Sequence, residues 1–310
     1  MLHRDAVSCT LTKRLVKRID RRMLARMSRS LTVLAAQVRP VTGDTAATLD
    51  KFEDEVQMAR TVFRDAQLLC FPELYLTGDD PFARGAPPDL EREVAQPIPG
   101  PLTDRVGKIA ARAKRWISAG SMFETGEDGA IHNTALVFDP TGELVARYRK
   151  LFPWRPFEIS TPGDAPAPVF EIPGIGKIGV MICYDGWFPE VARGLALAGA
   201  EAIIQPTLTT TPDREQELVL ARANAIVNQC FVINVNAVPS IGGGRSIAVD
   251  PEGRVLFELG QAEEFALETL ELDHAGRVYE HGTRGLNRVL HHLREAPTAV
   301  FEPYRRFLEG

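Results

Sequence analysis

The 310-residue sequence is poor in cysteine and has no long apolar run. Its cysteines lie far apart and form no Cys-x-x-Cys pair; they are Cys9, Cys70, Cys183 and Cys230. This spacing argues against a zinc knuckle and against a disulfide scaffold, and it predicts reduced thiols in a cytoplasmic protein. Because no apolar run approaches the roughly 20 residues that cross a bilayer, an integral membrane protein is excluded as well.

An excess of positive charge is also missing. The formal net charge is −5, whereas a nucleic-acid-binding protein needs a basic surface, so we expect no nucleic-acid partner. With 45% hydrophobic and 25% charged residues, the composition is that of a globular protein. It excludes a disordered chain, a coiled coil and a collagen-like repeat.

The positive charge that is present is concentrated at the N-terminus. Residues 1–30 contain nine Arg or Lys residues and only two acidic ones. Leu11, Leu15, Ile19 and Met23 recur every fourth residue, which is the period of an amphipathic helix. Such a segment either binds a membrane surface or acts in targeting, or it is a mobile extension. We favour the extension, and we see no catalytic feature in it.

From residue 31 onward, apolar segments typical of strands alternate with amphipathic segments typical of helices. We expect helices at 45–63, 102–115, 189–199, 213–229 and 284–295. The expected strands include 31–38, 66–71, 116–124, 177–183, 201–207 and 230–237, with a hairpin at 134–150. This order predicts an α/β fold with both parallel and antiparallel pairing, formed by a single domain of residues 31–310.

Cys183 is the candidate nucleophile of this domain. It ends the buried strand expected at 177–183, and Pro189 marks the start of the next helix. A strand end fixes a side chain while the loops around it admit substrate. A thiol with a pKa of about 8.5 is little ionised at pH 7, so catalysis requires a base or a cation beside it. The alternative is a cysteine of the core.

Charged residues in two other segments could serve that thiol. Glu73 directly follows the buried strand at 66–71, where a carboxylate must face a polar cleft or be buried at a cost. Lys150 stands at another strand end, and Glu158 follows eight residues later. Each of these residues alone could equally be a solvated loop residue.

Together the three segments resemble the nitrilase superfamily of carbon–nitrogen hydrolases. The matching stretches are PELYLTG, RKLFPWRPFEISTPGD and GVMICYDGWFPE, in the family's order, and the resemblance covers about residues 31–295. It implies a four-layer α-β-β-α sandwich with mixed sheets. It also implies homodimers or higher homo-oligomers, a small-molecule amide substrate, and neither a metal nor an organic cofactor.

The resemblance implies roles for individual residues as well. Glu73 is then the general base, Lys150 the cation that stabilises the oxyanion, and Cys183 the nucleophile that forms a thioester. Glu158 matches an additional active-site glutamate of the aliphatic amidase and formamidase group, and it would orient the substrate amide or Glu73. The backbone N–H of Tyr184 would assist Lys150 in binding the oxyanion.

The substrate follows less directly from these motifs. The chain is most similar to the amidase and formamidase group, which implies hydrolysis of a small aliphatic carboxamide to an acid and ammonia. However, Leu74 stands where that group has an aromatic residue, and WFPE resembles the N-carbamoylputrescine amidohydrolase branch. An N-carbamoyl-amine hydrolase and an acyl transferase therefore remain alternatives. A nitrilase fits less well because Tyr184-Asp185 replaces that branch's Trp-Glu, and the charged set argues against a silent scaffold protein.

Aromatic residues beside the motifs are candidates for the acyl pocket. We predict that the substrate-binding residues are Tyr75, Trp154, Tyr184, Asp185 and Trp187. The aromatic residues could equally belong to the core, and Asp185 could instead cap the turn that follows it.

Overall fold

The computed structural model describes residues 28–77, 89–238 and 242–309. Residues 1–27 of the expected basic extension thus lie outside the described residues. The extension was predicted to reach residue 30. In the described part of the chain, Arg29 ion-pairs with Glu201 and Asp273, and the first strand begins at Ser30.

Two mixed six-stranded sheets form the centre of the molecule. The first has the order β12 (Glu264–Glu271), β1 (Ser30–Gln37), β2 (Leu68–Cys70), β3 (Trp116–Thr125), β4 (Ile131–Phe138) and β5 (Leu144–Arg149). The second has the order β11 (Val255–Glu258), β10 (Ile247–Val249), β9 (Phe231–Asn236), β8 (Ala202–Thr207), β7 (Gly176–Val180) and β6 (Val169–Ile172). In each sheet three strands pair in parallel, β1-β2-β3 and β7-β8-β9, and the outer strands pair antiparallel.

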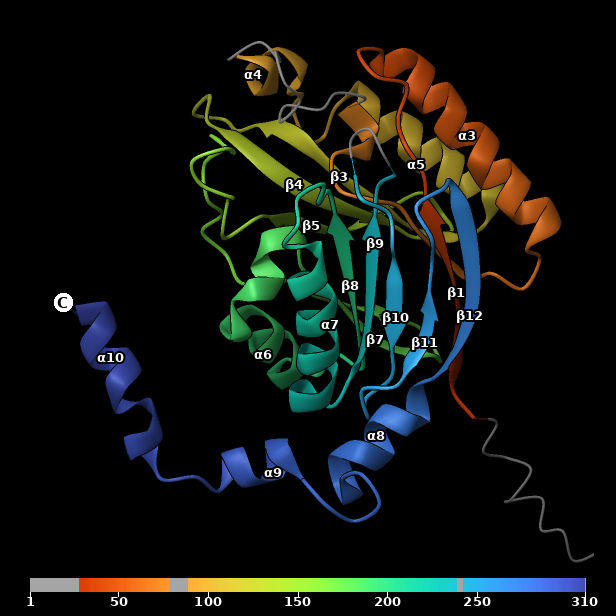
Figure 1. The fold of residues 1–310 in the computed structure, drawn as a ribbon. Coiled ribbons are helices and arrows are strands. Elements are labelled where there is room, and N and C mark those ends of the chain that lie inside the picture. Colours follow the sequence, from red (N-terminus) through yellow and green to blue (C-terminus); the bar gives the residue numbers. More distant parts are fainter. Residues whose placement is uncertain (1–27, 78–88, 239–241, 310) are drawn as a thin grey trace, which may run out of the picture.

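Helices cover the outer face of each sheet (Figure 1). The helices α3 (Thr45–Val62) and α5 (Pro101–Ala113) lie on the first sheet, and α6 (Pro189–Leu197) and α7 (Arg214–Asn228) lie on the second. Alternate residues of both sheets meet in an apolar core between them, which includes Val33, Val137, Ile178 and Ile204. The predicted α-β-β-α sandwich with mixed sheets is therefore confirmed.

The C-terminal part differs from the prediction. The helix expected at 284–295 is only α9 (Val289–Arg294), because Arg284 and Asn287 have positive φ angles of 51° and 61°, which interrupt a helix. A helix that we did not expect, α8 (Leu272–His281), follows β12 directly. Its signal was the helical spacing of buried Leu272, Ala275 and Val278.

The remaining elements are short. They are α4 (Leu90–Val94), α10 (Glu302–Glu309) and the 3-10 helices η1 (Tyr75–Thr77), η2 (Cys183–Trp187) and η3 (Thr298–Phe301). The C-terminal α10 stands away from the sandwich (Figure 1). Among the described residues, no helix combines the length and the apolar character that crossing a membrane requires.

A buried carboxylate ties together three strands of the first sheet. Glu124 on β3 is fully buried; it accepts a hydrogen bond from Thr134 on β4 and ion pairs from Arg147 and Arg149 on β5. Burial alone would raise the pKa of Glu124, but the bonds from the two arginines outweigh it and lower this pKa to about 2.

We expect this carboxylate to make stability depend on pH. Since the pKa of Glu124 is lower in the folded than in the unfolded protein, its contribution is present above about pH 4.5 and is lost as the pH falls toward 2. Glu124→Gln should lower the free energy of unfolding by about 2 kcal/mol at pH 7, allowing for the partly exposed arginines. Urea unfolding at pH 7 and at pH 3 measures this. A difference between variant and parent that does not shrink at pH 3 would contradict it.

Candidate active site

The three residues that the resemblance named converge at one edge of the sandwich. Glu73 follows β2, Lys150 follows β5, and Cys183 follows β7 across the gap between the sheets. Lys150 Nζ donates to Glu73 Oε1 at 2.9 Å, and the charges of Glu73 and Lys150 both act on the Cys183 thiol. The backbone N–H of Glu73 also bonds to Thr207 O at 3.3 Å, which links the two sheets at this edge. The structure thus brings an acid, a cation and a sulfur into one cluster.

Glu158 lies in the same cluster. Its Oε2 accepts from Lys150 Nζ at 2.7 Å and from the backbone N–H of Trp154 at 2.9 Å, while its Oε1 accepts from Ser160 Oγ at 3.0 Å. Glu158 is fully buried, and Lys150 and Glu73 are each only 2% exposed. Since an unpaired buried charge is strongly destabilising, the lysine between two carboxylates is what allows them to be buried here.

Sequence reasoning missed a residue that connects the two glutamates. Asn133 on β4 was not among the predicted site residues, but its fully buried Nδ2 donates to Glu73 Oε1 at 2.8 Å and to Glu158 Oε1 at 3.0 Å. Its backbone carbonyl also accepts from the N–H of Lys150 at 2.8 Å. The signal was an amide in the middle of a fully buried strand, where a polar side chain needs partners.

A tight turn presents the sulfur of Cys183. The residue has φ +44°, a left-handed conformation that costs a non-glycine residue roughly 1 kcal/mol or more. Gln205 Nε2 holds the Cys183 carbonyl at 2.8 Å. A Cβ on Gly186 would lie 2.3 Å from the same Gln205 nitrogen, so the turn requires glycine there. The partly exposed Cys183 then begins η2.

The charges of the cluster set the proton affinities of its members. Burial and the charge of Glu158 raise the pKa of Glu73, although Lys150 opposes them. Burial lowers the pKa of Lys150, but the two carboxylates raise this pKa by more than burial lowers it. The pKa of Lys150 therefore lies well above its ordinary value. Burial and the charge of Glu73 raise the pKa of Cys183 well above its ordinary value, with Lys150 opposing them. The resting site therefore holds a thiol beside a carboxylate with a raised proton affinity.

Tyr75 is not at this site, so its predicted contact with substrate is wrong. It is buried on the outer side of the first sheet, where its ring lies 5.5 Å from that of Phe71 and 6.2 Å from that of Phe52. Its hydroxyl donates to Glu55 Oε2 at 2.6 Å. The alternative interpretation, a residue of the core, is the one that the structure favours.

Asp185 likewise takes the alternative role of a cap. It is fully buried and accepts from the backbone N–H of Ile182 at 3.0 Å, from that of Phe152 at 3.0 Å and from Tyr148 Oη at 2.8 Å. With both oxygens engaged inside the protein, Asp185 holds the nucleophile turn against the segment after Lys150. Its predicted contact with substrate is therefore corrected to a positioning role.

The other predicted pocket residues lie close to the cluster along the chain and are partly exposed. Trp154 adjoins Phe157, with ring centroids 4.5 Å apart. Tyr184 lies 5.9 Å from Trp187 in the same measure, directly after the nucleophile. These three residues remain candidates for contacts with substrate.

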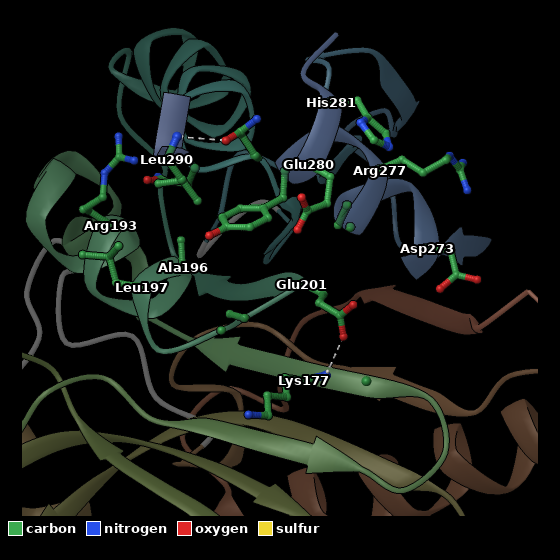
Figure 2. Close-up of a pocket in the computed structure, with 18 of the residues that line it drawn as sticks. Lys177, Arg193, Ala196, Leu197, Glu201, Asp273, Arg277, Glu280, His281 and Leu290 are labelled. Atoms are coloured by element: carbon green, nitrogen blue, oxygen red, sulfur yellow. Dashed lines mark hydrogen bonds between the residues drawn. The ribbon is translucent and has the colours of Figure 1, made fainter. Parts of the chain in front are cut away.

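A separate hollow of about 1530 Å³ lies away from this cluster. Figure 2 shows Arg193 and Leu197 of α6 on one side of it, Arg277 and Glu280 of α8 on the other, and Lys177 beneath. None of the predicted site residues lines it. Nor does any group of three or more His, Cys, Asp or Glu residues suited to hold a metal ion occur in the part of the chain that the structure describes.

Comparison with known proteins identifies the family. Residues 32–279 match the carbon–nitrogen hydrolase family. The chain belongs to this family. Among solved members of the nitrilase superfamily, the yeast protein Nit3 of Saccharomyces cerevisiae superposes with a TM-score of 0.72 at 25% identity, covering 81% of this chain and 94% of that one. The resemblance inferred from the three motifs is thus confirmed.

Two further carbon–nitrogen hydrolases bear on the chemistry. A formamidase of Bacillus cereus strain B4264 is 32% identical over 218 residues, which are 69% of this chain and 64% of the relative. The chain therefore spans slightly less than two thirds of that protein. An amidase from Nesterenkonia sp. superposes with a TM-score of 0.66 at 26% identity, covering 80% of this chain and 92% of that one. A variant of that amidase carries the acetamide moiety of fluoroacetamide covalently on its active-site cysteine.

Proposed function

We propose that this chain hydrolyses the carbon–nitrogen bond of a small aliphatic carboxamide, releasing a carboxylic acid and ammonia through a thioester on Cys183. The observation that carries this proposal is the Lys150 ammonium between Glu73 and Glu158, with the Cys183 thiol in the same cluster. This arrangement supplies a nucleophile, a general base and a cation for the oxyanion within one buried cluster.

Acylation begins with transfer of the thiol proton. Glu73 takes the proton of Cys183 as the sulfur attacks the amide carbon, since the raised pKa of Cys183 keeps the resting thiol protonated. The carbonyl electrons move onto oxygen, where the Lys150 ammonium and the Tyr184 backbone N–H stabilise the negative charge. Glu73 then gives the proton to the leaving nitrogen, and ammonia departs from the thioester.

Deacylation uses the same residues in reverse. Glu73 removes a proton from water, the resulting hydroxide attacks the thioester carbon, and the Cys183 sulfur leaves and recovers that proton. Glu158 and Asn133 do not exchange protons in this scheme. They hold the Lys150 ammonium and the Glu73 carboxylate in place through the bonds described above.

The substrate class rests on the relatives. The match to a formamidase and the structural likeness to an amidase favour a small carboxamide. Trp154, Tyr184 and Trp187 would then enclose the acyl group. An N-carbamoyl-amine substrate is the second candidate, supported by the WFPE sequence after the nucleophile turn.

Ammonia release from a panel of substrates tests this proposal. The panel contains formamide, acetamide, propionamide, an N-carbamoyl amine and the matching nitriles, each with and without hydroxylamine. We expect turnover of the short amides and little turnover of nitriles. A hydroxamate formed in preference to the acid would instead indicate acyl transfer, and no ammonia from any amide would refute the proposal.

The pH dependence of this activity should reflect Glu73. Glu73 must be unprotonated to act as a base and its pKa is raised, so kcat/KM should rise with pH along a limb above the ordinary value of 4.5. The charge of Glu158 contributes to that raised pKa, so Glu158→Gln should move the limb to lower pH while also reducing kcat. Initial rates between pH 4 and pH 9 measure both effects. A limb that moves to higher pH in the variant would contradict this account.

We further propose that copies of the chain associate. Leu197 on α6 and Val219 and Ile226 on α7 are 65%, 66% and 44% exposed, so these outer helices present apolar side chains that a second copy would cover. This supports the homodimer or higher homo-oligomer that the resemblance implies.

A further inference from the structure

The segment after β8 provides another contact to the sulfur of Cys183. The strands β7 and β8 are neighbours and run parallel, so the residues that follow them meet at the same sheet edge. Thr209, two residues beyond β8, places its Oγ1 3.8 Å from Cys183 Sγ. In the part of the chain that the structure describes, the sulfur is the hydrogen-bond partner of this hydroxyl.

In the resting site either the thiol or the Thr209 hydroxyl can be the donor of that hydrogen bond. Once the thiol proton has passed to Glu73, the sulfur has no hydrogen left, so the Thr209 hydroxyl is then the donor to the sulfur. This geometry becomes stronger once the thiol loses its proton, because a hydrogen bond to an anion is roughly twice as strong as one between neutral groups.

The backbone of Thr209 is fixed by a buried amide side chain. Asn236, at the end of β9, is fully buried; its Oδ1 accepts from Thr209 N at 2.9 Å and its Nδ2 donates to Thr209 O at 3.0 Å. Gly243 N donates to the same Thr209 carbonyl at 2.7 Å. These three bonds fix the main chain of Thr209, and its β-branched side chain has few χ1 rotamers, so the hydroxyl stays close to the sulfur.

The sulfur needs such a donor. Besides burial, the charges of Glu73 and of the buried Glu217 disfavour the thiolate, whereas Lys150 and the backbone N–H of Leu208 favour it. Transfer of the thiol proton neutralises Glu73, but burial and the charge of Glu217 still disfavour the anionic sulfur. A neutral hydrogen-bond donor stabilises the thiolate relative to the thiol without altering the charge of the cluster.

We propose that Thr209 is a further catalytic residue, whose hydroxyl hydrogen-bonds to the Cys183 sulfur and stabilises it as its proton passes to Glu73. This inference rests on the proposed function, because it assigns the thiol as the nucleophile. In the step, the S–H bond breaks, an O–H bond forms on Glu73 and an S–C bond forms to substrate. Thr209 keeps its own proton throughout.

Three single variants test this role. Thr209→Val removes the hydroxyl at nearly constant volume, Thr209→Ser retains it, and Thr210→Val changes an exposed neighbour as the matched control. The readouts are kcat and KM for a turned-over amide, and the pH dependence of Cys183 alkylation by iodoacetamide. Alkylation reports the thiol without requiring any amide turnover.

For Thr209→Val we expect kcat to fall about tenfold with KM little changed, and the alkylation profile to move up by about one pH unit. Thr209→Ser should recover most of the parent's kcat and most of its alkylation profile, and Thr210→Val should match the parent protein in both. A Thr209→Val protein with the parent's kcat and profile would overturn the inference. So would a Thr209→Ser protein as impaired as Thr209→Val, since the methyl group would then be what matters. If the parent turns over no amide while the alkylation profile still shifts, the proposed function fails and the contact to the sulfur stands.

Discussion

Cys183→Ala should abolish amide turnover, lowering kcat by at least about 10⁴-fold. The physical reason is that the thioester cannot form without the sulfur, and a general base and an oxyanion site alone recover only a small part of such catalysis. The Cys183 side chain is partly exposed at a turn held by the backbone, so the variant should fold normally. Ammonia release measures the activity, and intact-mass measurement of the quenched parent protein should reveal the acyl adduct.

Cys230 supplies the matched control for this variant. It is a free, buried cysteine in the apolar cluster beneath α6, and its pKa is raised to about 12 by burial, so it is inert as a nucleophile. Cys230→Ala should keep the parent's activity and acyl adduct. If instead Cys183→Ala retains turnover, or the adduct maps to another residue, the assignment of the nucleophile is wrong.

Lys150→Met should have the second largest effect, because it acts on both catalysis and stability. Loss of the ammonium removes one preorganised donor to the oxyanion, which costs about 10²- to 10³-fold in kcat. It also leaves Glu73 and Glu158 buried without their cation, which destabilises the fold by about 3–5 kcal/mol. Rates at saturating substrate and urea unfolding at pH 7 measure the two effects separately.

A double variant separates these two effects. Lys150→Met combined with Glu158→Gln removes one of the two unpaired charges, so it should recover a substantial part of the lost stability. It should recover none of the activity, because the donor to the oxyanion is still missing. A double variant that regains activity along with stability would show that Lys150 acts only by maintaining the fold.

The local sequence predicted most secondary structure because burial leaves a clear period along the chain. The expected helix at 213–229 is α7 (Arg214–Asn228), and the expected strand at 201–207 is β8 (Ala202–Thr207). The predictions of secondary structure that were wrong concern segments where the period of buried residues is short or interrupted. The helix α8 has only ten residues and directly follows the strand β12, and positive φ angles at Arg284 and Asn287 divide the segment before α9.

Some residues of the candidate site could likewise be predicted from the sequence, and others could not. Glu73, Lys150 and Cys183 could be predicted because each follows a strand and belongs to a motif with a known order. Asn133 and Thr209 could not, since each bonds to partners 25 to 60 residues away in the chain and nothing in the local pattern records such contacts. Tyr75 was misplaced because a motif fixes the position of a residue along the chain, not the side of the sheet on which its ring lies.

The sequence by itself therefore determined the family, the order of the strands and helices, and the three kinds of chemical group at the site. The tertiary structure decided which charges touch, that the ring of Tyr75 lies away from the site, and how strongly each acid holds its proton. The reason is physical: periodicity and motifs are local properties of the chain. Hydrogen bonds, desolvation and Coulomb interactions depend on distances between residues that only the folded sheets bring together.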